Sequence, residues 1–471
     1  MFRQRSAAER QTKVCTLDAC DELLQKNMNI ILHNKTGHSV CFLLFFLLAP
    51  FVVPGLQKWK IALPESFGKF SLLEAVDAKN PEAIEQKIIS TTPGEIEDAS
   101  GQAMKNFRNS LKKAEAGNHI TRITHYGDSP ITGDGITSTV RRKLQLRFGD
   151  AGHGFVLFSK PWNWYHHFGI KHWASEAWES DPMFIAKGDH RYGFGGASFT
   201  TNKSGAIAHF STAEEAEVGK LVSSFDIYFL AQLNGGEFEV IVDGISRGRV
   251  STASTEKRSG FHQVKVENGA HALEIKSVGN GELRMYGVVM ESGERGIQYD
   301  SLGINGAFIG LLNHYMDETS WLEQLKHRNP DLVILGYGAN ESEYENWPMD
   351  VYEKDTKEVV RRIRAALPEA SILFVGPMDR GKRGAGGKII TRPTIPKLIQ
   401  AQRRMAAELG CAFFDTFTAM GGEGTVAKWR ESKPVLMGGD LTHPTYDGSE
   451  IVGTLIHDAL IRAYYRSESK L

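Results

Sequence analysis

Two distant segments carry the residue types of a nucleophilic serine site. The segment THYGDSPITGDG places Ser129 among glycines and a proline, directly after an apolar alternation that predicts a strand. Near the other end of the chain, GGDLTHPT holds Asp440 and His443 with D-x-x-H spacing. On a turn, a carboxylate at this spacing fixes the histidine tautomer and stabilises the imidazolium that forms when histidine takes a serine proton. We expect Ser129 to be the nucleophile, His443 the general base and Asp440 the carboxylate.

Two further segments offer the donors that a developing oxyanion needs. SLGING follows a strand-like stretch and contains Gly306, whose backbone N–H can approach a substrate closely because glycine has no side chain. LGYGANES follows the apolar DLVIL, and its Asn340 can donate a side-chain N–H. Each segment alone is a common strand-to-loop turn. The ordered set favours catalysis, because functional residues of an open α/β sheet lie at the carboxyl ends of its strands.

The surrounding pattern predicts one α/β domain that is interrupted by a β-rich insertion. Short alternating strands with turn pairs such as Asn268-Gly269 fill the insertion, which is typical of a β-sandwich or jelly roll. The expected helices are 103–116, 137–148, 351–367, 396–409 and 449–464. The expected α/β strands are 119–126, 331–335, 371–375 and 411–414, and those of the insertion include 225–233, 238–242, 261–266, 271–277 and 283–290.

In the same order along the chain, these segments resemble blocks I, II, III and V of the SGNH/GDSL hydrolase family: Gly127-Asp128-Ser129, Gly306, Gly338-x-Asn340 and Asp440-x-x-His443. The resemblance implies a flavodoxin-like three-layer α/β/α fold and a Ser129–His443–Asp440 triad. It also implies an oxyanion hole made by the N–H groups of Ser129 and Gly306 and the Asn340 side chain.

Two positions of this chain fit the family pattern less directly: the glycine of block II and the residue after block III. The block II glycine is Gly303 or Gly306, and the family's apolar-small-Gly pattern favours Gly306. The family usually has Asp after block III, where this chain has Glu341.

The spacing of blocks I and II adds an architectural resemblance. These blocks usually lie a few tens of residues apart, whereas an insertion separates them here. An exported SGNH domain interrupted by a carbohydrate-binding-like β-domain resembles bacterial peptidoglycan O-acetylesterases. The predicted regions are an N-terminal tail with a signal peptide or anchor over 1–56, a stalk and leading helix over 57–117, a discontinuous hydrolase domain over 118–150 and 296–471, and a β-sandwich insertion over 151–295.

We therefore expect a serine esterase, a carboxylic ester hydrolase that removes acyl groups, chiefly O-acetyl groups, from a cell-envelope glycan such as peptidoglycan. An acylated glycan is the expected partner, and no cofactor is expected. Two alternatives stay open: an O-acyltransferase in which a sugar hydroxyl replaces water, and a glycan-binding scaffold with an inactive α/β domain. The intact triad set argues against the scaffold.

The segment KPWNWYHHFG concentrates aromatic side chains that suit stacking on sugar rings. Trp162, Trp164 and Tyr165, together with Asp128, are candidate substrate contacts, although packing in the core is the more frequent fate of such aromatics. Asp128 is also expected to shape the turn around the nucleophile. The two adjacent histidines lack a third ligand at usable spacing, so no metal site is expected.

The N-terminal region predicts export. The run from Val40 to Val53 is apolar throughout, apart from the break in character at Pro50, and is shorter than the ~20 residues of a spanning helix. It fits a signal peptide or a short signal anchor, with Met1 or Met28 as the start. We expect a periplasmic or cell-envelope protein, with residues 40–56 as the alternative membrane anchor. The net charge of −1 excludes the electrostatic footprint of a nucleic-acid binder.

Two motifs imitate known sites. GISRG around Ser246 matches a nucleophile elbow in letters, but strand-like residues on both sides predict a hairpin rather than the required strand, turn and helix. GPMDRGKRG imitates a phosphate-binding loop, yet Arg383 stands where serine or threonine is needed and no helix follows. The second motif is expected to form a mobile loop near the site; Asp379 and Arg380 are candidates for lining the pocket, although a solvated loop is the more frequent case.

Overall fold

The computed structural model describes residues 94–466, apart from 186–187 and 294. The predicted signal peptide or anchor, and the choice between Met1 and Met28, lie outside the described residues. Within the described part, no helix combines the length and apolar character needed to cross a bilayer.

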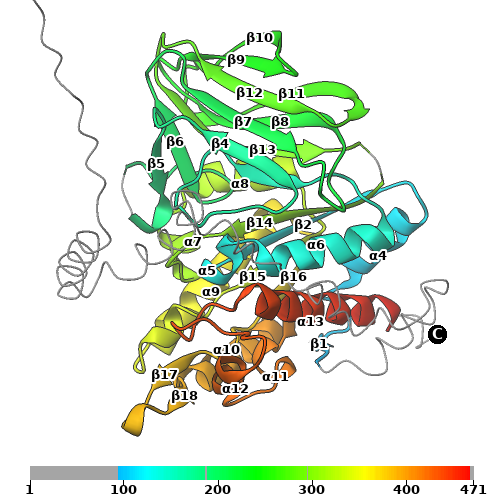
Figure 1. The fold of residues 1–471 in the computed structure, drawn as a ribbon, viewed down its shortest axis with the longest axis vertical. Helices are drawn as coiled ribbons and strands as arrows, with labels where there is room; N and C mark the ends of the chain where they lie inside the picture. Colours follow the sequence, from blue (N-terminus) through cyan, green and yellow to red (C-terminus); the bar gives the residue numbers. More distant parts are fainter. Residues whose placement is uncertain (1–93, 186–187, 294, 467–471) are drawn as a thin grey trace, which may run out of the picture. The chain divides into compact units, whose positions relative to one another are not determined.

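A central sheet organises the α/β part of the chain (Figure 1). Its spatial order is β1-β19-β16-β15-β2-β14. The strands are β1 (Ile96–Glu97), β2 (Ile120–Gly127), β14 (Gly296–Gly303), β15 (Leu332–Gly336), β16 (Ser371–Val375) and β19 (Ala412–Phe414). All of these strands pair in parallel except β1, which pairs antiparallel with β19. Numbered in chain order, the parallel strands run 2-1-3-4-5, which is the flavodoxin-like order.

Helices cover both faces of this sheet, and strand residues alternate between the two layers. Leu332 and Ile334 pack in one apolar cluster, with α4 (Lys105–Glu115), α6 (Gly135–Phe148) and α13 (Tyr446–Tyr465). Val333 and Leu335 pack in the other cluster, with α8 (Glu318–Arg328), α9 (Met349–Ala366) and α10 (Thr394–Glu408). This period of two is that of a strand buried on both faces. The predicted three-layer α/β/α fold is confirmed.

The α/β part begins earlier than residue 118. Ile96 in β1 pairs with Phe414, and the Phe107 N–H in α4 donates to Ser371 Oγ at 3.2 Å. Phe107 and Leu111 are fully buried against the sheet. The segment predicted as the end of a stalk and a leading helix is therefore the first strand and helix of the α/β part.

Between α6 and β14 the chain forms two antiparallel sheets. Their orders are β10-β9-β12-β7-β4 and β11-β8-β13-β6-β5, with β3 paired to β13. The strands are β3 (Gly154–Leu157), β4 (Ile170–Ala174), β5 (Glu179–Pro182), β6 (Ala197–Thr201), β7 (Ile207–Thr212), β8 (Val222–Ala231), β9 (Glu237–Val242), β10 (Ile245–Ser251), β11 (Arg258–Gly269), β12 (Ala272–Ser277) and β13 (Leu283–Glu291). Phe229 and Phe238, from opposite sheets, lie 5.6 Å apart between ring centroids, so the sheets face each other across an apolar core.

Ser246 lies in β10, which forms a hairpin with β9. The turn between these strands holds Asp243 and Gly244 at φ 53° and 76°, as a two-residue hairpin turn requires. The interpretation of GISRG as a hairpin is confirmed.

The β-rich segment shares one core with the α/β part. The Tyr126 hydroxyl in β2 donates to the Phe194 carbonyl at 3.0 Å and accepts from Trp321 Nε1 of α8 at 3.0 Å. The Phe194 N–H donates to Gln324 Oε1 at 2.6 Å. These buried bonds attach a loop of the β-rich segment to the central sheet and to α8, so the segment is held against the domain that it interrupts.

Shorter elements make up the rest of the described chain, and the loops of the site lie among them. They are α5 (Ser129–Thr132), α7 (Gly310–His314), β17 (Gly381–Arg383), β18 (Ile389–Thr391), α11 (Thr416–Ala419), α12 (Thr425–Glu431) and the 3₁₀ turns Met183–Ile185, Glu341–Glu343 and Ala385–Gly387.

Candidate active site

The predicted catalytic segments meet at the carboxyl edge of the central sheet. In the parallel ladder, Gly127 at the end of β2 stands opposite Gly303 of β14 and Gly336 of β15. Ser129 begins α5 immediately after β2, and the Gly306 and Asn340 loops follow the two neighbouring strands. The loops that follow these three strands therefore start at the same edge of the sheet. Ser129 lies at the point where the strand order reverses.

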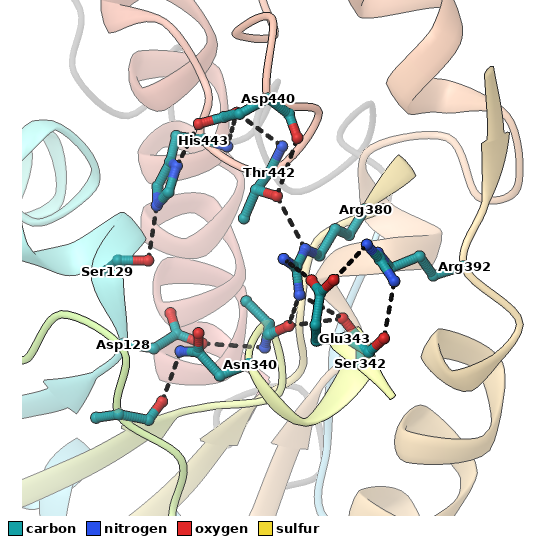
Figure 2. A network of polar contacts seen from close by, with 12 residues as sticks. Asp128, Ser129, Asn340, Ser342, Glu343, Arg380, Arg392, Asp440, Thr442 and His443 are labelled. Atoms are coloured by element: carbon teal, nitrogen blue, oxygen red, sulfur yellow. Dashed lines mark hydrogen bonds and ion pairs between the residues drawn. The ribbon is translucent and has the colours of Figure 1, made fainter. Parts of the chain in front are cut away.

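The structure brings the predicted nucleophile, base and carboxylate into one hydrogen-bonded series (Figure 2). Ser129 Oγ lies 2.7 Å from His443 Nε2. His443 Nδ1 lies 2.7 Å from Asp440 Oδ2. This geometry lets His443 accept the serine proton through Nε2 while Asp440 holds the Nδ1–H tautomer.

The loop that carries Asp440 and His443 is fixed by its own backbone. Asp440 Oδ1 accepts the N–H groups of Thr442 and His443, each at 3.0 Å. Partial burial acts to raise the pKa of Asp440, but the bond from the His443 ring and these two N–H groups outweigh it and hold that pKa well below its ordinary value. Leu441 takes a left-handed φ of 60°, a strained choice for this residue that lets the loop fold back. Asp440 is thus a fixed negative charge beside the imidazole.

The predicted oxyanion donors lie on adjoining loops. Asn340 Nδ2 donates to the Ala307 carbonyl at 2.7 Å, which leaves the second amide hydrogen for another acceptor. Gly306 has φ 74° in the exposed turn after β14, where its backbone conformation favours glycine. Gly303 instead is the last residue of β14, where a Cβ would come within 2.2 Å of the Thr132 nitrogen. Gly306 is the one of the two glycines in a loop position, and its donor role stays a prediction.

Arg380 joins the Asn340 loop to the loop of the base. Its Nε donates to Thr442 Oγ1 at 2.9 Å, and its other nitrogens donate to the Ala339 carbonyl and to Ser342 and Glu343. Figure 2 shows this guanidinium between the two loops. Arg380 comes from the loop that imitates a phosphate-binding motif, and the structure gives it a positioning role.

Asp128 connects the nucleophile turn to the Asn340 loop. Its buried Oδ2 accepts the Ala339 N–H at 3.0 Å. Burial raises the pKa of Asp128 to about 7, since the Ala339 bond and the charges of His443 and Arg380 offset only part of the desolvation. Asp128 shapes the turn, as one of its two predicted roles requires. Its burial contradicts the other predicted role, a contact with substrate.

Glu341 accounts for the departure from the family pattern. Its side chain is buried, and Oε1 accepts the Ile309 N–H at 3.0 Å. Burial raises the pKa of Glu341 to about 8. The longer side chain reaches the backbone of the segment that follows Gly306, so it ties the two loops of the predicted oxyanion donors together.

A cavity of about 440 Å³ lies beside the catalytic pair. Its walls include Ser129, Asn305, His443, Trp164, Phe168 and Tyr446. Trp164 is therefore where a substrate contact was predicted. Trp162 is partly buried instead, with its ring centroid 6.1 Å from that of Phe184.

Tyr165 corrects the prediction of a substrate contact. It is 2% exposed, and its hydroxyl accepts the Leu157 N–H at 3.0 Å and bonds His167 Nε2 at 3.0 Å. Tyr165 is thus a core residue, because the backbone of the loop turns its ring inward. Phe168 and Tyr446 were not predicted as substrate contacts; the signals for them were the place of Phe168 within the aromatic segment and the closeness of Tyr446 to His443 in sequence.

Of the two histidines in the aromatic segment, His167 bonds Tyr165 and His153, the second of which lies outside the segment. His153 Nε2 lies 2.9 Å from His167 Nδ1. Burial lowers the pKa of His167 to about 4 and that of His153 well below its ordinary value, so both rings are neutral at pH 7. Across residues 94–466, the described side chains form no cluster of three or more histidine, cysteine, aspartate or glutamate residues suited to a metal ion.

Comparison with protein families adds an independent observation. The GDSL-like Lipase/Acylhydrolase family matches residues 284–451. The chain carries a GDSL-like lipase/acylhydrolase domain. The match includes Gly306, Asn340, Asp440 and His443, whereas Ser129 lies before it, on the other side of the β-rich segment. The family match and the serine–histidine–aspartate geometry support ester hydrolysis as the chemistry of this domain.

Two similar proteins set this domain in context. A solved structure of a peptidoglycan O-acetylesterase has a TM-score of 0.65 and 24% identity, over 78% of this chain and 97% of that chain. At this identity, the likeness shows a shared fold. An acetylxylan esterase of Xylanibacter ruminicola is 29% identical over 86 residues, which are 18% of this chain and 16% of that protein. The aligned chain thus spans only a small part of that relative.

Proposed function

We propose that this chain is an exported serine esterase that removes acyl groups, chiefly O-acetyl groups, from a cell-envelope glycan such as peptidoglycan. The observation that carries the proposal is the Ser129–His443–Asp440 series, with both bonds at 2.7 Å, beside an aromatic cavity. The fold shared with a peptidoglycan O-acetylesterase and the short match to an acetylxylan esterase support an O-acetylated glycan as the substrate class.

In the first half of the reaction, Ser129 Oγ attacks the ester carbonyl carbon while His443 Nε2 takes the hydroxyl proton. The electron pair of the carbonyl moves to oxygen, and the N–H groups of Ser129 and Gly306 and the Asn340 amide would meet the charge. Asp440 stabilises the imidazolium. The intermediate then collapses: the bond to the sugar oxygen breaks, His443 protonates that oxygen, and the acyl group stays on Ser129.

In the second half, water replaces the sugar hydroxyl. His443 takes a proton from water, the hydroxide oxygen bonds the acyl carbon, and the bond to Ser129 Oγ breaks as the serine regains its proton. The side chains of His443 and Asp440 are 44% and 55% exposed, so solvent water reaches the base. This exposure supports hydrolysis over transfer to a second sugar.

The test is acetate release from O-acetylated peptidoglycan and from acetylated xylan. Ser129→Ala should lower kcat by more than about 10⁴-fold with the circular dichroism spectrum unchanged, because the acyl-enzyme cannot form. Ser246→Ala, which removes an exposed hairpin serine, is the matched control and should retain full activity. Full activity of Ser129→Ala would refute the assignment of the nucleophile.

The same assay separates the two remaining alternatives. Acetyl transfer to an added glycan acceptor, at the expense of free acetate, would make the chain a transferase. Absence of turnover by the wild-type protein on both glycans and on a small acetate ester would favour a binding scaffold.

Export is the part of the proposal that rests on sequence alone, on the apolar run from Val40 to Val53. Cell fractionation, with mass spectrometry of the N-terminal peptide, tests it. A native peptide from residues 1–26 would exclude Met28 as the start, and a protein found only in the cytoplasm would contradict export.

A further inference from the structure

The cavity beside Ser129 lies next to His443, the residue that protonates the leaving oxygen in the proposed reaction. Ser129 and His443 line it, whereas Gly306 and Asn340 are not among its lining residues. In ester hydrolysis, the carbonyl oxygen turns to the oxyanion donors, and the histidine protonates the oxygen that leaves. The alcohol half of the ester therefore extends past His443 into this cavity, whose volume of about 440 Å³ falls within the usual range for a ligand site.

Three exposed aromatic side chains form one part of the cavity lining, and we name them the aromatic wall: Trp164, Phe168 and Tyr446. They are 56%, 36% and 60% exposed. The rings of Phe168 and Tyr446 lie 5.6 Å apart between centroids. Aromatic faces are electron-rich, and the C–H groups on one face of a pyranose ring carry partial positive charge, so a sugar ring covers such surfaces favourably. Grouped exposed aromatics next to catalytic residues mark a binding surface.

We propose that the aromatic wall is the subsite for the pyranose ring that bears the O-acyl group, and that the buried Asp134–Arg141 pair positions this wall. The inference rests on the proposed function, because it names where that function's glycan binds. It assigns to the β-rich segment a direct part in the active site, since Trp164 and Phe168 belong to the loop between β3 and β4 of that segment.

The positioning contact is a clamp on the backbone of Phe168. Asp134 Oδ2 accepts the Phe168 N–H at 3.0 Å, and Arg141 Nη2 donates to the Phe168 carbonyl at 3.2 Å. Asp134 and Arg141 bond each other through both carboxylate oxygens, at 3.0 and 2.7 Å, and both are buried. A buried two-bond ion pair has few alternative geometries, so it fixes the peptide groups that it holds.

The clamp links the aromatic wall to the segments that carry the catalytic residues. Asp134 follows Ser129 in the same motif and takes a left-handed φ of 57° between Gly133 and Gly135, a conformation that aspartate tolerates. Tyr446 opens α13 shortly after His443 in sequence. Helices α6, which carries Arg141, and α13 pack side by side (Figure 1). The wall is thus tied to the nucleophile at one end and to the base at the other.

The test compares two substrates on the full chain: soluble muropeptides from O-acetylated peptidoglycan, and ethyl acetate, whose leaving alcohol is too small to reach the wall. Aromatic esters are unsuitable because their own rings would stack there. Trp164→Ala, Phe168→Ala and Tyr446→Ala should each raise KM for muropeptides about three- to tenfold, with kcat/KM for ethyl acetate within about twofold of wild type.

The chain offers matched controls away from the cavity. Trp173 in β4 is 47% exposed and Tyr344 is 62% exposed. Trp173→Ala and Tyr344→Ala should leave the muropeptide KM unchanged.

The outcomes distinguish the inference from the proposed function. Unchanged muropeptide KM in all three wall variants would overturn the subsite, as would an equal loss on both substrates, which indicates a structural role. A wild-type protein without activity on either substrate would overturn the proposed function.

The clamp has its own readout. Arg141→Lys keeps the charge but loses the two-bond geometry, and should raise the muropeptide KM about as much as Phe168→Ala while sparing ethyl acetate. When Arg141→Lys is combined with Phe168→Ala, the muropeptide KM should rise little further, because both changes remove the contact of the Phe168 ring with the sugar. Multiplying effects would overturn the positioning role. Asp134→Glu, which keeps the opposite charge and displaces it, provides the second variant if Arg141→Lys does not fold.

Discussion

Two buried aspartates flank the nucleophile in sequence, and their pKa values shift in opposite directions. Burial raises the pKa of Asp128 to about 7, because its bond from Ala339 and the charges of His443 and Arg380 compensate only part of the lost hydration. Burial also acts to raise the pKa of Asp134, but the charge and hydrogen bonds of Arg141 reverse the effect and hold that pKa well below its ordinary value.

The difference in pKa comes from the groups to which each neighbouring arginine donates its hydrogen bonds. Arg141 donates directly to both oxygens of Asp134. Arg380 acts on Asp128 through space, and its nitrogens donate to Thr442 and to the Asn340 loop. A carboxyl that stays protonated below pH 7 adds no negative charge where an oxyanion develops, whereas a permanently charged one anchors a backbone. One short turn thus has a catalytic side and an anchoring side.

The largest expected effect is the loss of the anchoring pair. Asp134→Asn leaves Arg141 buried without its partner charge and should lower the free energy of unfolding by about 3–5 kcal/mol. Chemical denaturation measures it, with Asp128→Asn as the control that should not lower the same quantity at pH 7, because asparagine replaces a carboxyl whose charge is disfavoured there. Equal losses in the two variants would remove the contrast.

The next effect belongs to the catalytic side. Asn340→Ala should lower kcat by about 10²–10³-fold with little change in KM, because the amide is needed where charge develops. Steady-state kinetics on ethyl acetate measures this. A rise in KM with normal kcat would instead assign Asn340 to substrate binding.

The pH dependence of stability separates the two carboxyls. The pKa of Asp128 is higher in the folded chain than in the unfolded chain, so its contribution is complete below about pH 4 and is lost as pH rises through about 7. Between pH 4 and 8, Asp128→Asn should therefore gain on the order of 2–4 kcal/mol of unfolding free energy relative to wild type.

Asp134 provides the internal comparison for this titration. Its pKa is lowered by folding, so its contribution is present above its ordinary pKa and is lost only at more acidic pH. The deficit of Asp134→Asn should stay constant from pH 4 to 8. A constant difference for Asp128→Asn over the same range would show that its carboxyl is not held protonated.

The smallest effect tests the indirect route of Arg380. Thr442→Val removes the acceptor of the Arg380 Nε bond and should lower kcat about three- to tenfold, because the loop of the base loses one contact with the Asn340 loop. Thr442→Ser keeps the hydroxyl and should restore the rate. A variant with normal kcat would confine Arg380 to a structural role.

Much of the fold follows from local pattern. Buried apolar runs predict strands because both sheet faces are covered, and the strand predicted over 371–375 coincides with β16. The two-residue β1 is too short for any periodicity, so its pairing with β19 could not be predicted. Its place depends on the fit of Ile96 beside Phe414, which is a tertiary property.

The residues of the site likewise divide into those that could be predicted from the sequence and those that could not. Ser129, Asp440 and His443 could be predicted because their order and local spacing are those of a known mechanism, and the structure places them in hydrogen-bonding contact. The pairing of Asp134 with Arg141 could not, because it depends on the left-handed backbone conformation of Asp134 at the start of α6. The inward ring of Tyr165 was also beyond prediction, since an irregular loop has no period that separates buried from exposed positions.

The place of the β-rich segment between β2 and β14 has a consequence for biosynthesis. Among the described strands, β2 pairs with β14 and β15, both of which are made after the whole insertion. Until then its two edges stay open, and open strand edges invite pairing with other chains. The insertion can fold first, because its strands from β3 to β13 pair with one another. Catalytic competence is therefore the last property that the emerging chain acquires, since His443 arrives after every strand of the sheet.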